Sequence, residues 1–252
     1  MSPTDFVPFD EAAPKPLEVS DDAPAESPGD HFRRGLATMR EQPMPERQIA
    51  SRRAGESVRE VISRLTATSA PPEVLDAVTA KMEEAIALLD GHGSRRYEGY
   101  AEASGAADAP DDRRFFDWSP QLGAANPLAP PIFIDVEGEI VVGRARFGCA
   151  YEGPPGSVHG GFVAAAFDEV LGVAQTLSGQ VGMTGTLTIR YRRPTPLHTD
   201  LRFEASLDGV SGRKVLTSAK LFAVGQLTAE ATALFVSVSA ERFSALAANR
   251  PS

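Results

Sequence analysis

The 252-residue sequence has little cysteine, little histidine and no surplus of positive charge. Its single cysteine, Cys149, cannot form an internal disulfide, which favours a reducing compartment. A formal net charge of -9 argues against a general nucleic-acid binder, because neutralising phosphates requires a basic surface. No apolar run approaches the roughly 18 residues of a membrane-spanning helix, and the acidic, proline-rich N-terminus does not resemble a secretory signal. We therefore expect a soluble, cytoplasmic protein with no nucleic-acid partner and no membrane span.

The motifs of several common catalytic sites are also missing. The run Gly156-Ser-Val-His-Gly160 has its serine one place too early for a G-x-S-x-G elbow. There is no Walker A motif and no dinucleotide-binding G-x-G-x-x-G. The four histidines are scattered, and no Cys/His cluster has the spacing of a metal site. The sequence therefore predicts no metal and no redox cofactor.

Composition and apolar spacing divide the chain into five segments, namely 1–50, 51–92, 93–125, 126–243 and 244–252. The first is predicted to be disordered or to form an arm on the folded part, because it offers little apolar surface to offset ordering entropy. The second is a helical extension, with apolar residues at three- and four-residue spacing from Ser57 and again from Pro72. The third is an irregular connector in which Phe115, Phe116 and Trp118 either seal a core edge or wall an acyl pocket. The fourth is the main domain, and the last is a tail.

The main domain combines one apolar helix with six strand-like runs. The runs cover 132–136, 139–147, 184–192, 201–207, 214–224 and 227–239. In the third run, Thr186 and Thr188 alternate with Leu187, Ile189 and Tyr191, as in a strand with one apolar face. Two strands, a helix and four strands joined by short turns predict an α+β fold, in which an antiparallel β-sheet packs on one long helix.

A stretch of turn residues leads directly into that helix and carries its unusual chemistry. After His159, Gly160 and Gly161 comes an apolar helix with Asp168 and Glu169 inside it. A helix that begins near Gly160 presents unpaired backbone N–H groups, backed by the positive end of its dipole, as an oxyanion hole requires. Asp168 can act as a nucleophile or as a general base toward water. Glu169 points about 100° away around the helix, so we expect a structural role for it.

The spacing of these residues has a consequence for assembly. Gly160 and Asp168 are separated by roughly 12 Å along one helix, so they cannot both touch one carbonyl group. If both are catalytic, the helix start of one subunit must face the carboxylate of another across a two-fold interface. The sequence therefore predicts a homodimer, or a dimer of such dimers.

Five motifs follow one another in the main domain, namely Asn126-Pro-Leu-Ala-Pro-Pro131, His159-Gly-Gly161, Asp168, Met183-Thr184 and Tyr191-Arg-Arg-Pro-Thr-Pro196. In this order and spacing, over about residues 120 to 240, they resemble the hotdog-fold acyl-CoA thioesterases. The nearest subgroup is the PaaI-like one within the 4-hydroxybenzoyl-CoA thioesterase superfamily. The resemblance implies the hotdog fold, an antiparallel sheet wrapped around a long central helix, with an acyl-CoA as substrate. It also implies no cofactor, because coenzyme A is part of the substrate.

The resemblance further implies a role for individual residues. The Gly160 N–H would polarise the thioester carbonyl, and His159 would orient the thioester. Asp168 of the neighbouring subunit would act as nucleophile or activate a water molecule that Thr184 positions. The candidates for binding the substrate, including the phosphates of CoA, are Gly161, Arg192, Arg193, Arg213 and Lys214.

We therefore predict an acyl-CoA thioesterase that hydrolyses a fatty or aromatic acyl-CoA to the free acid and CoA. Two alternatives remain open, a hotdog enoyl-CoA hydratase and a non-catalytic acyl-CoA-binding or sensor protein. Hydratases of this fold tend to use an Asp…His pair within one loop–helix segment, whereas His159 here precedes Asp168 by nine residues, which favours the esterase. An intact Asp168 argues against a binder, which has no need for a buried carboxylate.

Overall fold

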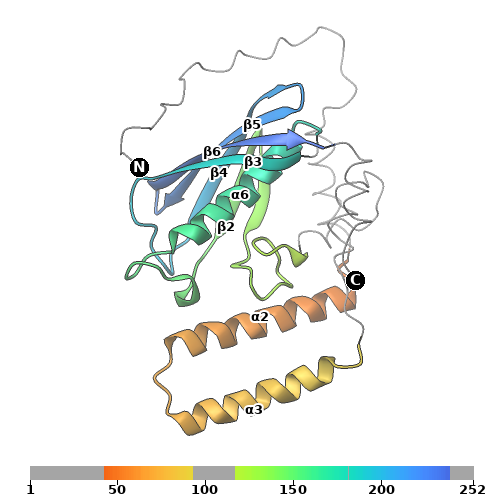
Figure 1. The fold of residues 1–252 in the computed structure, drawn as a ribbon, viewed down its shortest axis with the longest axis vertical. Coiled ribbons are helices and arrows are strands. Elements are labelled where there is room, and N and C mark those ends of the chain that lie inside the picture. The colour runs from red at the N-terminus through yellow and green to blue at the C-terminus, as the bar shows by residue number, and fades with distance from the viewer. Residues whose placement is uncertain (1–42, 93–116, 181, 239–252) are drawn as a thin grey trace, which may run out of the picture.

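The computed structural model describes residues 43–92, 117–180 and 182–238 (Figure 1). The predictions made for the N-terminal arm up to residue 42, for the connector up to residue 116 and for the tail 244–252 lie outside the described residues. Within them, an antiparallel sheet carries one long helix, α6, across a face, and two further helices lie below it (Figure 1). The predicted α+β arrangement is confirmed.

The sheet has six strands in the order β1-β2-β4-β5-β6-β3, and all neighbours are antiparallel. The strands are β1 (Phe133–Glu137), β2 (Ile140–Ala145), β3 (Gly182–Tyr191), β4 (Leu201–Ser211), β5 (Lys214–Ala223) and β6 (Gln226–Ser237). Each of the six predicted runs is a strand. The largest difference is at β4, which continues to Ser211 because a register shift beside Gly209 absorbs that glycine within the strand. The turn to β5 falls instead at Gly212, whose φ of 57° suits glycine.

The core lies between the sheet and helix α6 (Gly160–Thr176). The helix buries Val163, Ala166, Phe167, Val170, Leu171, Val173, Ala174 and Gln175. Phe167 meets Phe203 of β4 edge to face, with ring centroids 5.3 Å apart. Gly143 of β2 permits α6 to approach the sheet closely, since a Cβ at this position would lie 3.0 Å from Val170 Cγ2. Trp118 is 43% exposed, so a role in sealing the core edge is wrong for this residue.

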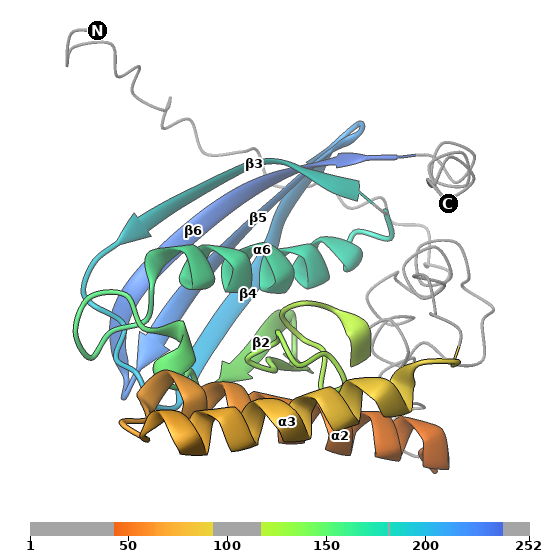
Figure 2. The same cartoon turned by 60° about the horizontal axis from the view of Figure 1, so that its bottom comes forward.

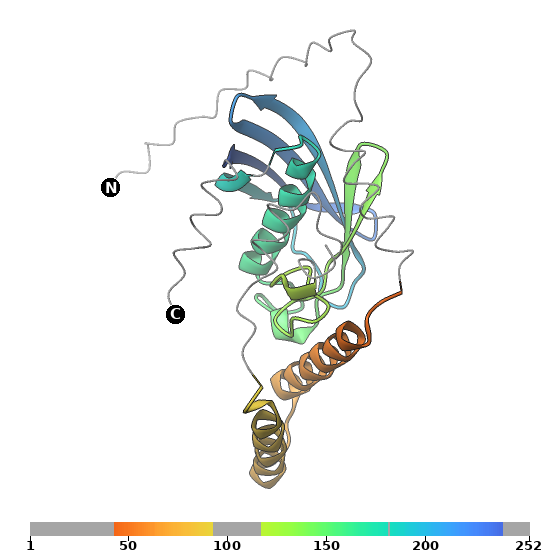
Figure 3. The same ribbon diagram turned by 90° about the vertical axis from the view of Figure 1, so that its right-hand side faces the viewer.

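The N-terminal extension forms two helices, α2 (Glu46–Ala67) and α3 (Pro72–Leu89). Helix α2 begins at Glu46, ahead of the predicted start at Ser57 and inside the segment expected to be disordered or an arm. The first turns of α2 are mostly polar and are held by contacts to the main domain. They therefore lack the three- and four-residue apolar spacing from which a helix is predicted. Helix α3 runs back antiparallel to α2 (Figures 1 and 2), and lies on the far side of α2 from the sheet (Figure 3). None of its residues is buried, so α2 makes the contact with the domain.

Among the described helices, none combines the length and the apolar character that crossing a membrane requires.

Candidate active site

His159 caps the N-terminus of α6 and closes the turn before it. Its backbone N–H donates to the Tyr151 carbonyl at 2.8 Å, and its Nδ1 accepts from the Gly161 N–H at 3.0 Å. A Cβ at Gly161 would lie 3.1 Å from that Nδ1, so glycine suits this close approach. Because Nδ1 is the acceptor, the proton of the neutral ring is on Nε2. His159 therefore offers an N–H donor from an exposed side chain.

The first turn of α6 leaves one backbone donor free. Phe162 and Val163 both donate to the His159 carbonyl, at 2.9 and 3.3 Å. The Gly161 N–H is taken by the His159 ring. In the described part of the chain, the Gly160 N–H has no hydrogen-bond partner. Of the backbone N–H groups predicted to be available at the helix start, that of Gly160 remains. The Gly161 N–H is not available to a substrate in this arrangement.

Tyr191 reaches the same turn from the end of β3, and the sequence did not predict this contact. Its hydroxyl donates to the Gly160 carbonyl at 2.8 Å, although the residue is 52% exposed. Strand alternation placed Tyr191 on the apolar face with Leu187 and Ile189, which indicated packing. Its position in the Tyr191–Pro196 motif was the one available signal of a functional role.

Asp168 lies roughly two turns further along α6, against β3. The Thr184 hydroxyl donates to Asp168 Oδ1 at 2.8 Å. The β3–β6 register shifts between Thr184 and Thr186, and such a bulge re-aims the side chains beside it. The structure therefore brings Asp168 and Thr184 together within one chain, while Gly160 lies roughly 12 Å away along the helix.

Glu169 points to another side of α6 and has a partner there. It accepts a hydrogen bond from the Ser119 hydroxyl at 2.8 Å. Burial raises the pKa of Glu169, the Ser119 hydrogen bond opposes that rise, and the charge of neighbouring Asp168 adds to it. This contact agrees with the structural role expected for Glu169.

The basic residues predicted to bind CoA form two separate groups, Arg192 with Arg193 and Arg213 with Lys214. The first group follows β3 at its Tyr191 end. The second lies at the β4–β5 turn, level with Met183 at the other end of β3, because both Lys214 and Met183 pair with Val236. The two ends are roughly 26 Å apart along the strand. One chain thus has one basic pair at the Tyr191 end of β3 and another at the level of its Met183 end, instead of a single patch.

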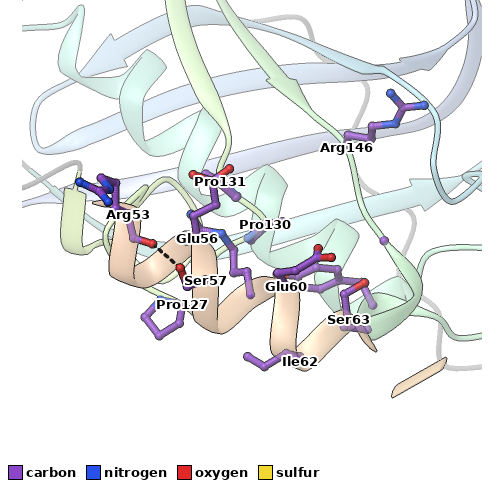
Figure 4. A pocket seen from close by; sticks show the side chains of 14 residues that line it. Arg53, Glu56, Ser57, Glu60, Ile62, Ser63, Pro127, Pro130, Pro131 and Arg146 are labelled. Atoms are coloured by element: carbon purple, nitrogen blue, oxygen red, sulfur yellow. Dashed lines mark hydrogen bonds between the residues drawn. The ribbon is translucent and has the colours of Figure 1, made fainter. Parts of the chain in front are cut away.

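A cleft of about 710 Å³ lies away from these residues, between α2 and the loops that precede β1 and α6 (Figure 4). Its walls carry charges of both signs, from Arg53, Glu60 and Arg146. None of the predicted site residues lines it. Tyr151 at its wall packs edge to face on Phe162 of α6, with ring centroids 4.9 Å apart. The cleft belongs to the junction with α2 and not to the α6 site.

A six-stranded antiparallel sheet wrapped around one long helix, with His-Gly-Gly at the start of that helix, defines a hotdog-fold protein. The family model of the thioesterase superfamily matches residues 155–230. A crystal structure of a thioesterase superfamily protein is 32% identical with a TM-score of 0.64, and the match covers 74% of this chain and 94% of that chain. This chain belongs to the thioesterase superfamily.

Curated relatives match part of this chain. The acyl-coenzyme A thioesterase THEM4 of Xenopus laevis is 41% identical over 88 residues, which are 34% of this chain and 39% of that protein. THEM4 of Mus musculus is 35% identical over 97 residues, which are 38% of this chain and 42% of that protein. This chain thus spans about two fifths of the length of the curated relatives it matches.

Proposed function

We propose that this protein is a PaaI-like acyl-CoA thioesterase, which hydrolyses the thioester of a fatty or aromatic acyl-CoA to the free acid and CoA. The observation that supports the proposal is that the candidate catalytic groups lie in two separate places on α6. A free Gly160 N–H stands at the helix start, and an Asp168 carboxylate held by Thr184 stands further along. The relatives named acyl-coenzyme A thioesterases support the substrate class.

We propose that the two parts of the site meet across a homodimer interface. Among the strands that the structure describes, β3 lies at an edge of the sheet and pairs with β6, which leaves its other edge available to a second strand. Antiparallel pairing of β3 with the same strand of a second copy, across a two-fold axis, would bring the Gly160 end of one protomer to the Asp168 end of its partner. The same pairing would bring the two basic groups together beside one site.

The chemistry then follows from the groups present. The thioester oxygen accepts a hydrogen bond from the Gly160 N–H, and the helix dipole stabilises the charge that develops there. The Asp168 carboxylate of the partner takes a proton from water as that water attacks the carbonyl carbon, or attacks the carbon itself to give an anhydride that water cleaves. Thr184 occupies Oδ1 and leaves Oδ2 for this work. The C–S bond breaks and CoA leaves as its thiol, so the reaction needs no metal or redox cofactor.

The test is a thiol-release assay across short, long and aromatic acyl-CoAs, comparing the wild type with Asp168→Asn. The variant keeps the shape of the side chain and the partner of Thr184, so we expect an intact fold and oligomer with CoA release reduced at least about 100-fold. We expect a smaller loss for His159→Ala. Undiminished turnover in Asp168→Asn would contradict the mechanism. Tight acyl-CoA binding by a wild type that releases no CoA would favour the sensor alternative, and hydration of an enoyl-CoA would favour the hydratase.

A further inference from the structure

Helix α2 grips the segment 117–126 of the main domain with one face. The gripping residues are Gln48, Arg52, Gly55 and Arg59, whose spacing of three and four places them along one side of the helix. This set, with the segment it holds, is called the α2 clamp below. All of it lies outside residues 155–230, which the thioesterase family model matches.

The clamp makes three kinds of contact. Arg52 places Nε and Nη2 each 2.7 Å from Asp117 Oδ1, and Asp117 is only 2% exposed. Arg59 donates from Nη1 to the Asn126 carbonyl and from Nη2 to the Ala124 carbonyl, both at 2.9 Å. Gly55 lets the backbones meet, since a Cβ there would lie 2.7 Å from the Ala125 carbonyl oxygen. An ion pair to a buried carboxylate, the paired hydrogen bonds of Arg59 and a backbone contact thus fix the two ends of the segment.

Inside the segment, Ser119 is held in one orientation. Its hydroxyl oxygen accepts from the backbone N–H groups of Gln121 and Leu122, at 3.2 and 3.1 Å. With its lone pairs taken, the hydroxyl directs its proton to Glu169 Oε1, 2.8 Å away. The clamped segment therefore connects α2 to the middle of α6 through the hydrogen bond between Ser119 and Glu169.

Glu169 and Asp168 are consecutive on α6 and have partners on different sides of it. Asp168 is bound by Thr184 of β3, and Glu169 is bound by Ser119 of the clamped segment. Because the two side chains point about 100° apart, the two hydrogen bonds hold α6 from two sides, in addition to the packing of its buried face. We expect a movement of the segment to displace Glu169 and, with it, the neighbouring Asp168 relative to Thr184.

We propose that α2 is a positioning element of the active site, which acts through Ser119 and Glu169 on the Asp168–Thr184 pair. The proposal rests on the proposed thioesterase function and extends it to a helix outside the family domain. It makes Arg59, Ser119 and Glu169 positioning residues. Displacements well below 1 Å matter at this point, because roughly 1 Å of misplacement can cost about 100-fold in rate.

The experiment compares Arg59→Ala and Ser119→Ala with Arg64→Ala in the full chain. Arg59 binds backbone carbonyls, so its removal leaves no buried charge unpaired, and Arg64 is a matched control with a side chain 79% exposed on the same helix. We expect kcat for CoA release to fall about 10-fold in both test variants, with KM changed less than about twofold. The control should match the wild type. Glu169→Gln, which keeps an oxygen for Ser119, should retain more activity than Glu169→Leu.

Hydrogen–deuterium exchange supplies a readout that does not depend on activity. Arg59→Ala should accelerate amide exchange in 117–126 and also in the middle of α6, whereas Arg64→Ala should leave both unchanged. A purely structural clamp would lower the melting temperature but leave kcat and α6 exchange at wild-type values, and that result would overturn the proposal. If the wild type releases no CoA from any acyl-CoA, the proposed function fails, and the exchange of α6 alone decides the role of the clamp.

Discussion

The hydroxyl of Tyr191 is the polar contact that joins the end of β3 to the start of α6. Tyr191→Phe removes this donor and leaves the Gly160 carbonyl without it, while the exposed ring costs the fold little. A neutral hydrogen bond contributes about 0.5–1.5 kcal/mol, so we expect kcat for thiol release to fall about 2- to 10-fold and the melting temperature to fall by only a few degrees. Wild-type turnover in this variant would show that the contact does not position Gly160.

Because burial raises the pKa of Glu169, we expect the stability of the protein to depend on pH. A carboxyl whose pKa is raised on folding favours the folded state below its ordinary value of 4.5, and this advantage is lost as pH rises through the folded pKa. Wild-type stability relative to Glu169→Gln should therefore decline as pH rises above 4.5. Urea unfolding of both proteins from about pH 4 to 8 measures the difference, with Glu83→Gln on the exposed helix α3 as control. Parallel curves for wild type and Glu169→Gln would contradict the prediction.

At the scale of the elements, the contact between α6 and the sheet depends on a pair of buried rings. Phe203 is fully buried and meets Phe167 edge to face. Phe203→Ala leaves a cavity under α6, and we expect the free energy of unfolding to fall by about 3–5 kcal/mol. Denaturant unfolding measures this loss. The exposed aromatic Phe133 on β1 provides the matched control, since Phe133→Ala should change stability much less.

The elements that the sequence predicted are those with an apolar period. The alternation in β3 and the three- and four-residue spacing in α6 both arise from burial on one face, so both elements were predicted, with Leu187 and Ile189 on the inner side of β3 but Tyr191 exposed. The start of α2 was missed because Gln48 and Arg52 are held by one buried carboxylate, a long-range contact that leaves no period in the sequence. The same holds within the site. Asp168 and Gly160 were proposed from local spacing, whereas Tyr191 and Ser119 make contacts to α6 from 31 and 50 residues away along the chain.

At the scale of the whole molecule, the proposed site between two subunits predicts that two inactive variants restore each other's activity. Gly160→Pro removes the free N–H with little cost, because proline suits the first position of a helix and His159 already has the extended backbone that precedes proline. After subunit exchange with Asp168→Asn, each mixed dimer has one site with an intact Gly160 and an intact partner Asp168. We expect roughly a quarter of wild-type activity from random exchange. If the site lay within one chain, the mixture would regain no activity. Light scattering at the assay concentration should show a dimer or a larger oligomer, and a strict monomer would contradict the shared site.

The contact of α2 with Asp117 makes the N-terminal extension and the hotdog domain depend on each other for stability. A recombination event that kept residues 117–243 and replaced the helix before them would discard Arg52, the arginine paired with Asp117. A buried carboxylate left without its cation is strongly destabilising. Gly55 adds a second constraint, since a foreign helix with a larger residue at that point could not approach Ala125. We therefore expect a transplanted hotdog domain to be stable only behind a helix with a matching face.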